Sequence, residues 1–248
     1  MSKYAAVILA AGKGTRMNEG QSSPIPKVMF KIHNRPMIEY SIENIKNAGI
    51  EKIVLVVGYK KEMVMEDIGS SVEYAVQEEQ LGTGHAVKMA RSILEGKTEA
   101  VLVSYGDMPM YRVETIKKVI DLYDKEKPTI AMLTVLTDDP IIDDFSRVIR
   151  GANGDVLATV ECKDCTEEQL TICEKNPSLY IFNSEWLWHN LEKISTENSQ
   201  KEYYLPDLIG IACEQGKRIV AHATEDVTEA LGINNQEQLK KVEEILAK

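Results

Sequence analysis

The sequence lacks a hydrophobic run long enough to cross a membrane, which takes roughly 18 to 20 apolar residues. It contains only 4 cysteines in 248 residues, too few for a disulfide scaffold, and this usage is typical of the reducing cytoplasm. Positive charge is also scarce, since 29 Lys and Arg face 39 Asp and Glu, for a formal net charge of -10. An acidic chain is a poor non-specific nucleic-acid binder. We therefore expect a cytoplasmic protein that contacts neither membrane nor nucleic acid.

Two short motifs that would suggest export or a structural metal are incomplete. The apolar stretch Tyr4 to Ile8 is not followed by a small-residue cleavage site but by a glycine loop, so we interpret it as a first strand and not as a signal peptide. Cys162 and Cys165 have the spacing of half a zinc site, but no second CxxC or HxxxH follows. Ordinary loop cysteines are the better interpretation.

Apolar runs alternate with amphipathic segments through the first half of the chain. Such alternation predicts βαβ units and a parallel sheet, whose strands are buried on both faces. The strands are expected at Val7–Ala10, Lys52–Val57, Glu73–Val76, Ala100–Asp107 and Thr129–Thr137. The helices are expected at Met37–Ala48, Thr83–Leu94 and Thr115–Tyr123.

The pattern changes after Pro140. A turn-rich segment predicts a hairpin, and the rest of the chain adds a strand and helices. The hairpin is expected at Arg147–Arg150 and Val156–Glu161, the strand at Ser178–Phe182, and the helices at Ser184–Lys193, Tyr204–Gln215 and Gln236–Leu246. Asn235 can cap the last helix, with Gln238 placed for a capping box. We predict one α/β domain over residues 1–248, with a Rossmann-like, open, mostly parallel sheet, helices on both faces and a small lobe. Its ligand cleft should lie outside the carboxyl ends of the strands.

The stretch LAAGKGTRM, Leu9 to Met17, follows the first strand. Gly12 and Gly14 would let backbone amides approach an anion closely, and Lys13 and Arg16 add positive charge. The order of residues matches neither a Walker A loop nor the dinucleotide-binding fingerprint, which requires a glycine at the position of Met17. The motif favours a phosphate site, and a tight strand-to-helix turn with solvated cations is the alternative.

Two further segments carry polar groups to the same strand ends. Pro26 stiffens the segment that carries Lys27, which is either a third site cation or a solvated lysine. In QEEQLGTGHA, Gln77 and Gln80 offer amides that suit a pyrimidine edge, and Thr83 can cap the next helix. We interpret His85 in that helix as a packing residue.

YGDMP, Tyr105 to Pro109, ends a buried strand. Asp107 stands where a carboxylate can bind a divalent cation that bridges phosphates. The alternative is an aspartate that caps a helix or stabilises a turn. Asp143 and Asp144 are interpreted as a solvated acidic run.

Seven motifs occur in an order that resembles one family. They are LAAGKGTRM, PKV, QLGTGHA, YGDMP, VECKDCT, EYYLPD and GINN. From about Tyr4 to Leu246 the chain resembles the N-terminal uridylyltransferase (pyrophosphorylase) domain of the bacterial bifunctional enzyme that makes UDP-N-acetylglucosamine, within the sugar nucleotidyltransferase superfamily. The resemblance implies the nucleotide-diphospho-sugar transferase fold, with a nucleotide-binding half at 1–137 and a sugar-binding half at 138–248. It implies Mg2+-dependent transfer of uridylate from UTP to a sugar-1-phosphate, for cell wall precursor synthesis.

The resemblance also implies a role for each matching residue. Nucleotide binding falls to Leu9, Ala10, Ala11, Gly12, Lys13, Gly14, Gln77, Gln80, Gly82, Thr83, Tyr105 and Gly106. Arg16 and Lys27 are the implied catalytic cations, facing the pyrophosphate and the other phosphates. Asp107 and Asn234 would hold Mg2+, and Ser146, Glu161 and Asn176 would bind the sugar. Without the resemblance, we would interpret Asn234 as a residue beside a helix cap and not as a metal ligand.

The chain departs from the family pattern on the sugar side. Phe145-Ser146 stands where the family has Tyr-Gly, and Pro177-Ser178 where it has Thr-Gly. N-acetylglucosamine-1-phosphate is the leading acceptor, while another sugar or amino-sugar phosphate, CTP or dTTP as donor, and a sugar-nucleotide sensor without turnover stay open. No hexapeptide repeats of a left-handed β-helix follow, so no acetyltransferase domain is expected. The protein is expected to be a monomer or weak dimer.

Overall fold

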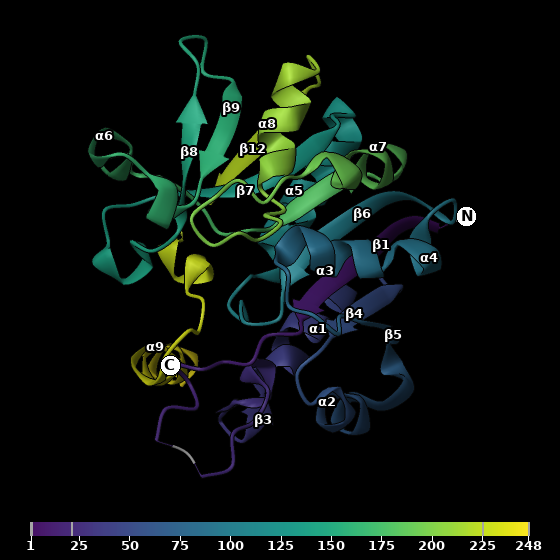
Figure 1. Ribbon diagram of the computed structural model, residues 1–248, viewed down its shortest axis with the longest axis vertical. Coiled ribbons are helices and arrows are strands. Elements are labelled where there is room, and N and C mark those ends of the chain that lie inside the picture. The colour runs from purple at the N-terminus through teal and green to yellow at the C-terminus, as the bar shows by residue number, and fades with distance from the viewer. Residues whose placement is uncertain (1, 21, 225, 248) are drawn as a thin grey trace.

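A large central sheet organises the chain, and the computed structural model describes residues 2–20, 22–224 and 226–247 of it (Figure 1). The 10-stranded sheet has the order β5-β4-β1-β6-β11-β7-β10-β8-β9, and β12 pairs with β7. Its strands are β1 Ser2–Ala10, β4 Ile53–Val57, β5 Glu73–Val76, β6 Thr98–Tyr105, β7 Ile130–Leu136, β8 Ser146–Arg150, β9 Val156–Val160, β10 Glu174–Asn176, β11 Tyr180–Asn183 and β12 Ile219–Thr224. A separate pair joins β2 Lys31–Ile32 to β3 Arg35–Pro36.

The first region of the sheet is parallel. Strands β5, β4, β1 and β6 run in one direction, with Leu9 level with Val56 on one side and with Tyr105 on the other. The chain leaves β1 for β4 and β5 and then returns to β6 on the opposite side of β1. The carboxyl ends of all four strands therefore share one edge, and the change of direction at β1 opens a crevice there.

The second region is mostly antiparallel. Strand β11 runs against both β6 and β7, β10 runs against β7 and β8, and β12 alone runs parallel to β7. Strands β8 and β9 form the predicted hairpin, which stands at the top of Figure 1. This region extends the sheet and raises a wall beside the crevice.

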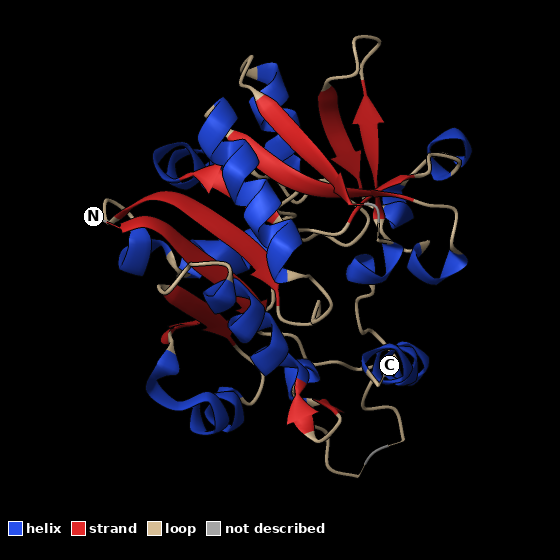
Figure 2. Ribbon diagram, turned by 180° about the vertical axis from the view of Figure 1, so that it is seen from behind, coloured by secondary structure: helices blue, strands red, loops and turns tan. Residues whose placement is uncertain are grey.

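Helices cover both faces because the strands alternate their side chains between two hydrophobic layers. Along β1, Ala6 and Ile8 enter a layer with α1 and α5, while Val7 and Leu9 enter a layer with α3, α7 and α8. Figure 2 shows helices lying across the sheet from behind. The helices are α1 Met37–Asn47, α2 Lys61–Ile68, α3 Thr83–Met89, α4 Arg91–Leu94, α5 Val113–Glu126, α6 Glu167–Leu170, α7 Ser184–Asn190, α8 Asp207–Glu214 and α9 Gln236–Leu246.

Most predicted elements are present with shifted ends, whereas β5 and α9 have the predicted bounds. The predicted helix over Thr83–Leu94 is divided at Ala90 into α3 and α4. Sequence patterns did not indicate α2, β10 or β12. The predicted capping box is only half right: Asn235 accepts the Gln238 N–H, but Oε1 of Gln238 accepts the N–H of Asn234 at 2.7 Å. None of the helices within the described ranges has the length and apolar content that crossing a membrane requires.

The C-terminal helix α9 lies beside the N-terminal loop (Figure 1). The side chain of Gln236 donates to the carbonyl of Met17 at 3.0 Å. The segment just before α9 thereby reaches the crevice, which brings residues from both ends of the chain to the same place.

Candidate active site

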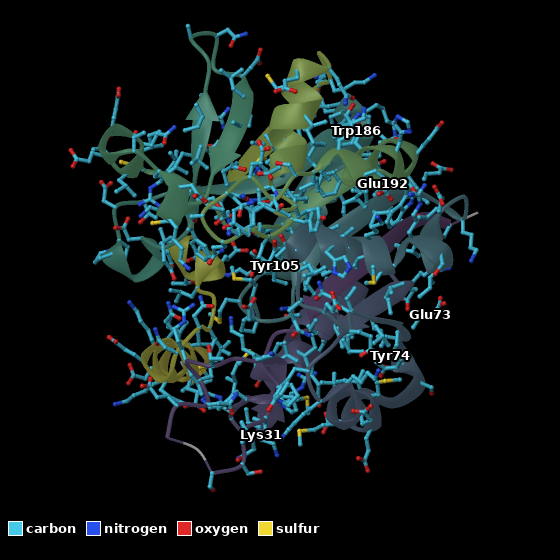
Figure 3. All side chains as sticks on the ribbon, viewed as in Figure 1. Lys31, Glu73, Tyr74, Tyr105, Trp186 and Glu192 are labelled. Carbon is cyan, nitrogen blue, oxygen red and sulfur yellow. The ribbon has the colours of Figure 1, made fainter. Side chains whose placement is uncertain are left out.

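Two adjoining cavities open at the carboxyl edge of the parallel strands. The first cavity, of about 210 Å³, brings together most of the predicted nucleotide-binding residues. These are Leu9, Ala10, Ala11, Gly12, Gln77, Gln80, Gly82, Thr83 and Tyr105, with Lys27 and Asp107 beside them. The second cavity, of about 220 Å³, is lined by Ser146, Glu161 and Asn234 and shares Thr83, Tyr105, Asp107 and Glu202 with the first. Figure 3 shows Tyr105 near the centre of the molecule.

Lys27 lines the first cavity and contacts both predicted metal ligands, Asp107 and Asn234. It begins a short 3-10 turn, Lys27–Met29, directly after Pro26. Its ammonium forms an ion pair with Asp107 and donates to Oδ1 of Asn234 at 2.6 Å. Three groups from distant parts of the chain therefore converge, and Lys27 is not a solvated lysine.

Asp107 and Asn234 together form a donor set that suits Mg2+. The two side-chain oxygens already converge on one cationic group, the Lys27 ammonium. Magnesium prefers oxygen ligands, and proteins commonly supply one or two carboxylates while substrate phosphates and water complete the shell. Within the described ranges, no cluster of three or more His, Cys, Asp or Glu is arranged to hold a metal. A magnesium ion here would accordingly depend on phosphate oxygens.

Asn234 is held in place by backbone contacts that its motif did not reveal. The N–H of Ile233 donates to the carbonyl of Asp107 at 3.0 Å. The side chain of Gln238 fixes the N–H of Asn234, so that the Oδ1 of Asn234 remains directed at Lys27. The segment GINN is therefore docked directly on YGD.

The loop after β1 is closed by a residue that the sequence analysis missed, Asn18. Its side chain donates to the carbonyls of Gly14 at 3.0 Å and Ile25 at 2.8 Å, and it accepts the N–H of Ile25 at 2.8 Å. Gly14 has φ +64°, and a Cβ on it would lie 2.8 Å from Cβ of Lys27. The loop thus packs against the lysine that it was expected to accompany.

Four of the predicted site residues line neither cavity. They are the predicted nucleotide-binding residues Lys13, Gly14 and Gly106 and the predicted catalytic cation Arg16. Lys13 and Arg16 are exposed. Gly14 packs on Lys27, and a Cβ on Gly106 would lie 2.7 Å from Ile38 and 3.2 Å from the Leu9 carbonyl. In this structure both glycines are needed for close packing.

The predicted N-cap role of Thr83 is wrong. Gly82, with φ +108°, is the N-cap of α3, and the Thr83 hydroxyl accepts the N–H of Leu205 at 2.9 Å. The N–H of Tyr203 donates to Leu81 and the N–H of Gly84 donates to Tyr203. The segment EYYLPD is therefore hydrogen-bonded to QLGTGHA, and this contact brings Glu202 to both cavities.

Gln77 is 3% exposed, yet it lines the first cavity. Its amide nitrogen donates to the carbonyl of Gly82 at 3.1 Å and lies 3.0 Å from Nδ1 of His85. His85, expected only to pack, therefore makes a polar contact with a predicted base-reading residue.

The second cavity is acidic. Its lining includes the carboxylates Asp107, Asp144, Glu161 and Glu202 and no Lys, Arg or His. Burial raises the pKa of Glu161, and the hydroxyl of Ser146, which bonds to this carboxylate, partly offsets the rise in pKa. Pro177 and Ser178 line the same cavity, and Ser178 adopts φ +68°, a conformation that favours glycine.

Asn176 lies behind the wall of this cavity. Its side chain is 0% exposed, bonds to the Tyr180 hydroxyl and accepts the N–H of Ser178 at 3.1 Å. The structure thus connects Asn176 to the second cavity through its neighbours, because Pro177 and Ser178 follow it in sequence and Ser146 lies opposite it in the pairing of β10 with β8.

Asp143 is not simply a solvated acid. Its carboxylate bonds to Arg147 at 2.7 Å and Lys175 at 3.0 Å, and both of these cations are buried. The two basic groups hold the pKa of Asp143 below its usual value, with the Lys175 hydrogen bond as the main cause. This cluster anchors the segment that carries Phe145 and Ser146.

Comparisons with known proteins show which family this chain belongs to. Residues 6–198 match the family model described as "MobA-like NTP transferase domain". The chain is 41% identical over 243 residues to "Bifunctional protein GlmU" of Exiguobacterium sp., covering 98% of this chain and 52% of that protein. It is 40% identical over 243 residues to "Bifunctional protein GlmU" of Bacillus licheniformis, with 98% and 52% covered. The chain spans about half the length of these curated relatives.

The fold recurs in a solved structure of UDP-glucose pyrophosphorylase complexed with UDP-glucose. The two superpose with a TM-score of 0.79 at 17% sequence identity, covering 100% of this chain and 99% of the other. At this identity the likeness shows the fold, which is that of the nucleotide-diphospho-sugar transferases. With its family model matched over most of its length, the chain belongs to the MobA-like NTP transferase domain family.

Proposed function

We propose that the protein transfers uridylate from UTP to N-acetylglucosamine-1-phosphate, giving UDP-N-acetylglucosamine and pyrophosphate, with Mg2+. The convergence of Lys27, Asp107 and Asn234 at the junction of the two cavities carries this proposal. The similarity to the GlmU proteins over 98% of the chain supports the choice of donor and acceptor. Residues 1–137 would supply the nucleotide side and residues 138–248 the acceptor side.

The reaction joins an oxygen of the sugar phosphate to the α-phosphorus of UTP and breaks the bond between that phosphorus and the β-phosphate oxygen. Pyrophosphate departs with the bonding electron pair. The attacking oxygen is already ionised, so the protein has no proton to remove. Its contribution is to position the reactants and to stabilise charge. The absence of a Ser/His/Asp or Cys/His arrangement in the sequence motifs agrees with this demand.

Lys27 is the residue placed to stabilise the charge that develops on the phosphates. Lys27 lines the first cavity, and its ammonium is paired with Asp107, which the two cavities share. Asp107 and Asn234 would hold Mg2+, which neutralises phosphate charge when bound. Lys13 and Arg16 would contact the pyrophosphate only if the loop that carries them folds toward the substrate.

The acceptor side fits a hydroxyl-rich or aminated sugar. Glu161 presents a carboxylate that accepts hydrogen bonds from hydroxyl groups, and Ser146 already donates to it. The acidic lining favours a second candidate acceptor, an amino-sugar-1-phosphate with a free ammonium group. Such a group would be attracted by the carboxylates of the second cavity.

Pyrophosphate release with Mg2+ tests the proposal, measured over a grid of UTP, CTP, dTTP and GTP against several sugar-1-phosphates. The grid includes both the N-acetylated and the free amino sugar. We expect strong release only with UTP and N-acetylglucosamine-1-phosphate. Strong release with the free amino sugar alone would favour the second candidate, and a silent grid with UTP still bound would overturn both.

Asp107→Asn separates an enzyme from a sugar-nucleotide sensor. It preserves the size of the side chain and removes the charge expected to hold the metal. We expect turnover to be lost while the uridine part of the ligand still binds. Unchanged turnover would contradict the role given to Asp107.

A further inference from the structure

We propose that His85 is a positioning residue that locks the amide of Gln77, so that the first cavity accepts uracil and rejects cytosine. This inference deepens the proposed function and rests on it only in taking a pyrimidine nucleotide as the ligand. It concerns a residue outside the two cavities, because His85 lines neither of them.

The orientation of the Gln77 amide follows from the chemistry of its neighbours. One end of the amide lies 3.1 Å from the carbonyl oxygen of Gly82. A carbonyl oxygen only accepts hydrogen bonds, so the group facing it must be the NH2 and not the amide oxygen. Gly82 itself is held by its left-handed φ of +108° and by close packing on Tyr203.

His85 binds the same NH2 group. Its Nδ1 lies 3.0 Å from Nε2 of Gln77. Since Nε2 of Gln77 is a donor, Nδ1 of His85 must be the acceptor, and the proton of the neutral ring must be on Nε2. Two acceptors therefore hold the NH2 on one side of the amide.

The amide oxygen is left for the ligand. No partner for Oε1 of Gln77 is found among residues 2–20, 22–224 and 226–247. Gln77 is 3% exposed and lines the first cavity, and its Oε1 is not among the buried unpartnered atoms of the described residues, so this acceptor stays accessible at the cavity wall until a bound ligand covers it. A buried acceptor that meets another acceptor is costly.

Uracil and cytosine differ at the position such an acceptor would read. Uracil carries a donor, N3–H, whereas N3 of cytosine is an acceptor. Facing the Gln77 oxygen, uracil makes a hydrogen bond and cytosine leaves two acceptors opposed. A site built around such a contact discriminates strongly against the mismatched partner. We expect UTP to bind roughly 10- to 100-fold more tightly than CTP.

His85 can be replaced without removing a core side chain. The ring is half-buried and also borders a separate cavity of about 420 Å³ with Lys88 and Glu192. Lys88 is paired with Glu192 at 2.7 Å, which in turn binds Arg91 at 3.1 Å. A variant at His85 therefore leaves this charge cluster in place.

Calorimetric titration of the full chain with UTP and with CTP, in Mg2+ and without acceptor, tests the inference. His85→Leu removes one of the two acceptors and leaves only the Gly82 carbonyl to hold the NH2 of Gln77, so the turned amide becomes less costly. We expect the preference for UTP to fall by at least about threefold, through tighter CTP binding and weaker UTP binding. His85→Asn, whose Oδ1 stands near the former Nδ1, should retain most of the preference. His189→Leu, an exposed histidine on α7, is the matched control and should change nothing.

A wild-type preference that survives in His85→Leu with the circular dichroism spectrum intact overturns the inference, as does a wild-type protein without preference. If His85→Leu does not fold, the imidazole nitrogen shifts of the wild-type protein decide. The tautomer protonated on Nε2 supports the inference, and one protonated on Nδ1 overturns it.

The outcome is separable from that of the proposed function. A UTP preference that depends on His85, together with a silent acceptor grid, leaves the inference standing and rejects the transfer reaction. Transfer to N-acetylglucosamine-1-phosphate with a preference indifferent to His85 does the reverse.

Discussion

The two cavities differ in what builds their walls. The first is bounded mainly by loops that follow parallel strands, and its lining includes two glycines and three alanines. The second is bounded by side chains on the antiparallel extension and on segments that return from late in the chain. Glycine-rich loops at strand ends tolerate few residue types because the backbone itself must fit. A wall of side chains can change its chemistry without changing the fold, and the second cavity, proposed to take the acceptor, is lined by Phe145-Ser146 and Pro177-Ser178, where a departure from the family pattern is expected.

The largest effect is expected at Lys27, where the two cavities join. Lys27→Ala should lower turnover by roughly 10²- to 10³-fold, the scale for one group that stabilises developing charge. Pyrophosphate release measures the effect, with UTP titration to show that nucleotide binding persists.

Lys31→Ala is the matched control, an exposed lysine that lies well away from Tyr105 in Figure 3. It should keep wild-type turnover. A loss below tenfold in Lys27→Ala would sink the role given to this lysine.

The next effect concerns how the loop after β1 packs against that lysine. Gly14→Ala places a Cβ 2.8 Å from Cβ of Lys27 on a residue with φ +64°, so the backbone or the lysine must move. We expect turnover to fall about 10- to 100-fold, since small displacements of a catalytic group are costly.

Gly20→Ala separates displacement from backbone strain. Gly20 also has a left-handed φ, +77°, but nothing lies within 4 Å of an added Cβ. It should lose some stability and keep its turnover. Equal losses of turnover in the two variants would show that loop strain, and not contact with Lys27, governs the rate.

Gly14 also shows how far sequence reasoning reaches. The apolar runs and glycine loops are local patterns, so strands, loops and their gathering at one sheet edge could be predicted. The motif marked Gly14 as special but not why, because the reason is a contact with Lys27 from the next segment. Asn18, which ties these two segments together, carries no motif of its own.

Contacts between distant segments account for the other differences. The sequence around Thr83 is typical of a helix N-cap. In the structure, however, the Thr83 hydroxyl accepts a hydrogen bond from the N–H of Leu205. Glu202 lines both cavities because the backbone of EYYLPD is hydrogen-bonded to that of QLGTGHA. Strand β12 carries few fully buried residues, so its hydrophobic signal is weak until it is paired with β7.

On the acceptor side, Glu161→Gln should act on one substrate only. It preserves shape and removes the charge that receives hydrogen bonds, so the KM for the sugar-1-phosphate should rise about tenfold while the KM for UTP stays the same. Because burial raises the pKa of Glu161, wild-type affinity for the acceptor should weaken as pH falls toward that raised pKa, whereas the variant should not show this dependence.

Glu168→Gln, exposed on α6, serves as its control and should match the wild type in both constants. An equal rise in the KM for UTP would contradict the separation of the two cavities. It would also weaken the contrast between them.

The smallest effect concerns stability on the acceptor side. Burial and repulsion from Asp164 raise the pKa of Asp207 to about 6, although it begins α8, where the helix dipole favours a carboxylate. Between about pH 4 and pH 6 the folded protein binds this proton more tightly than the unfolded chain does, so stability due to this group is greatest at low pH and is lost as pH rises.

Asp207→Asn removes that penalty at neutral pH. Relative to wild type, its free energy of unfolding should be about 1 kcal/mol larger at pH 8 than at pH 4, a modest value because Asp207 is partly exposed and water screens it. Urea unfolding at both pH values measures the difference, and Asp121→Asn on the exposed side of α5 should show none of it. A difference of opposite sign would mean that the helix dipole outweighs burial. In that case the Asp207 carboxylate would stabilise the fold at neutral pH, and its contribution would be lost as the pH falls.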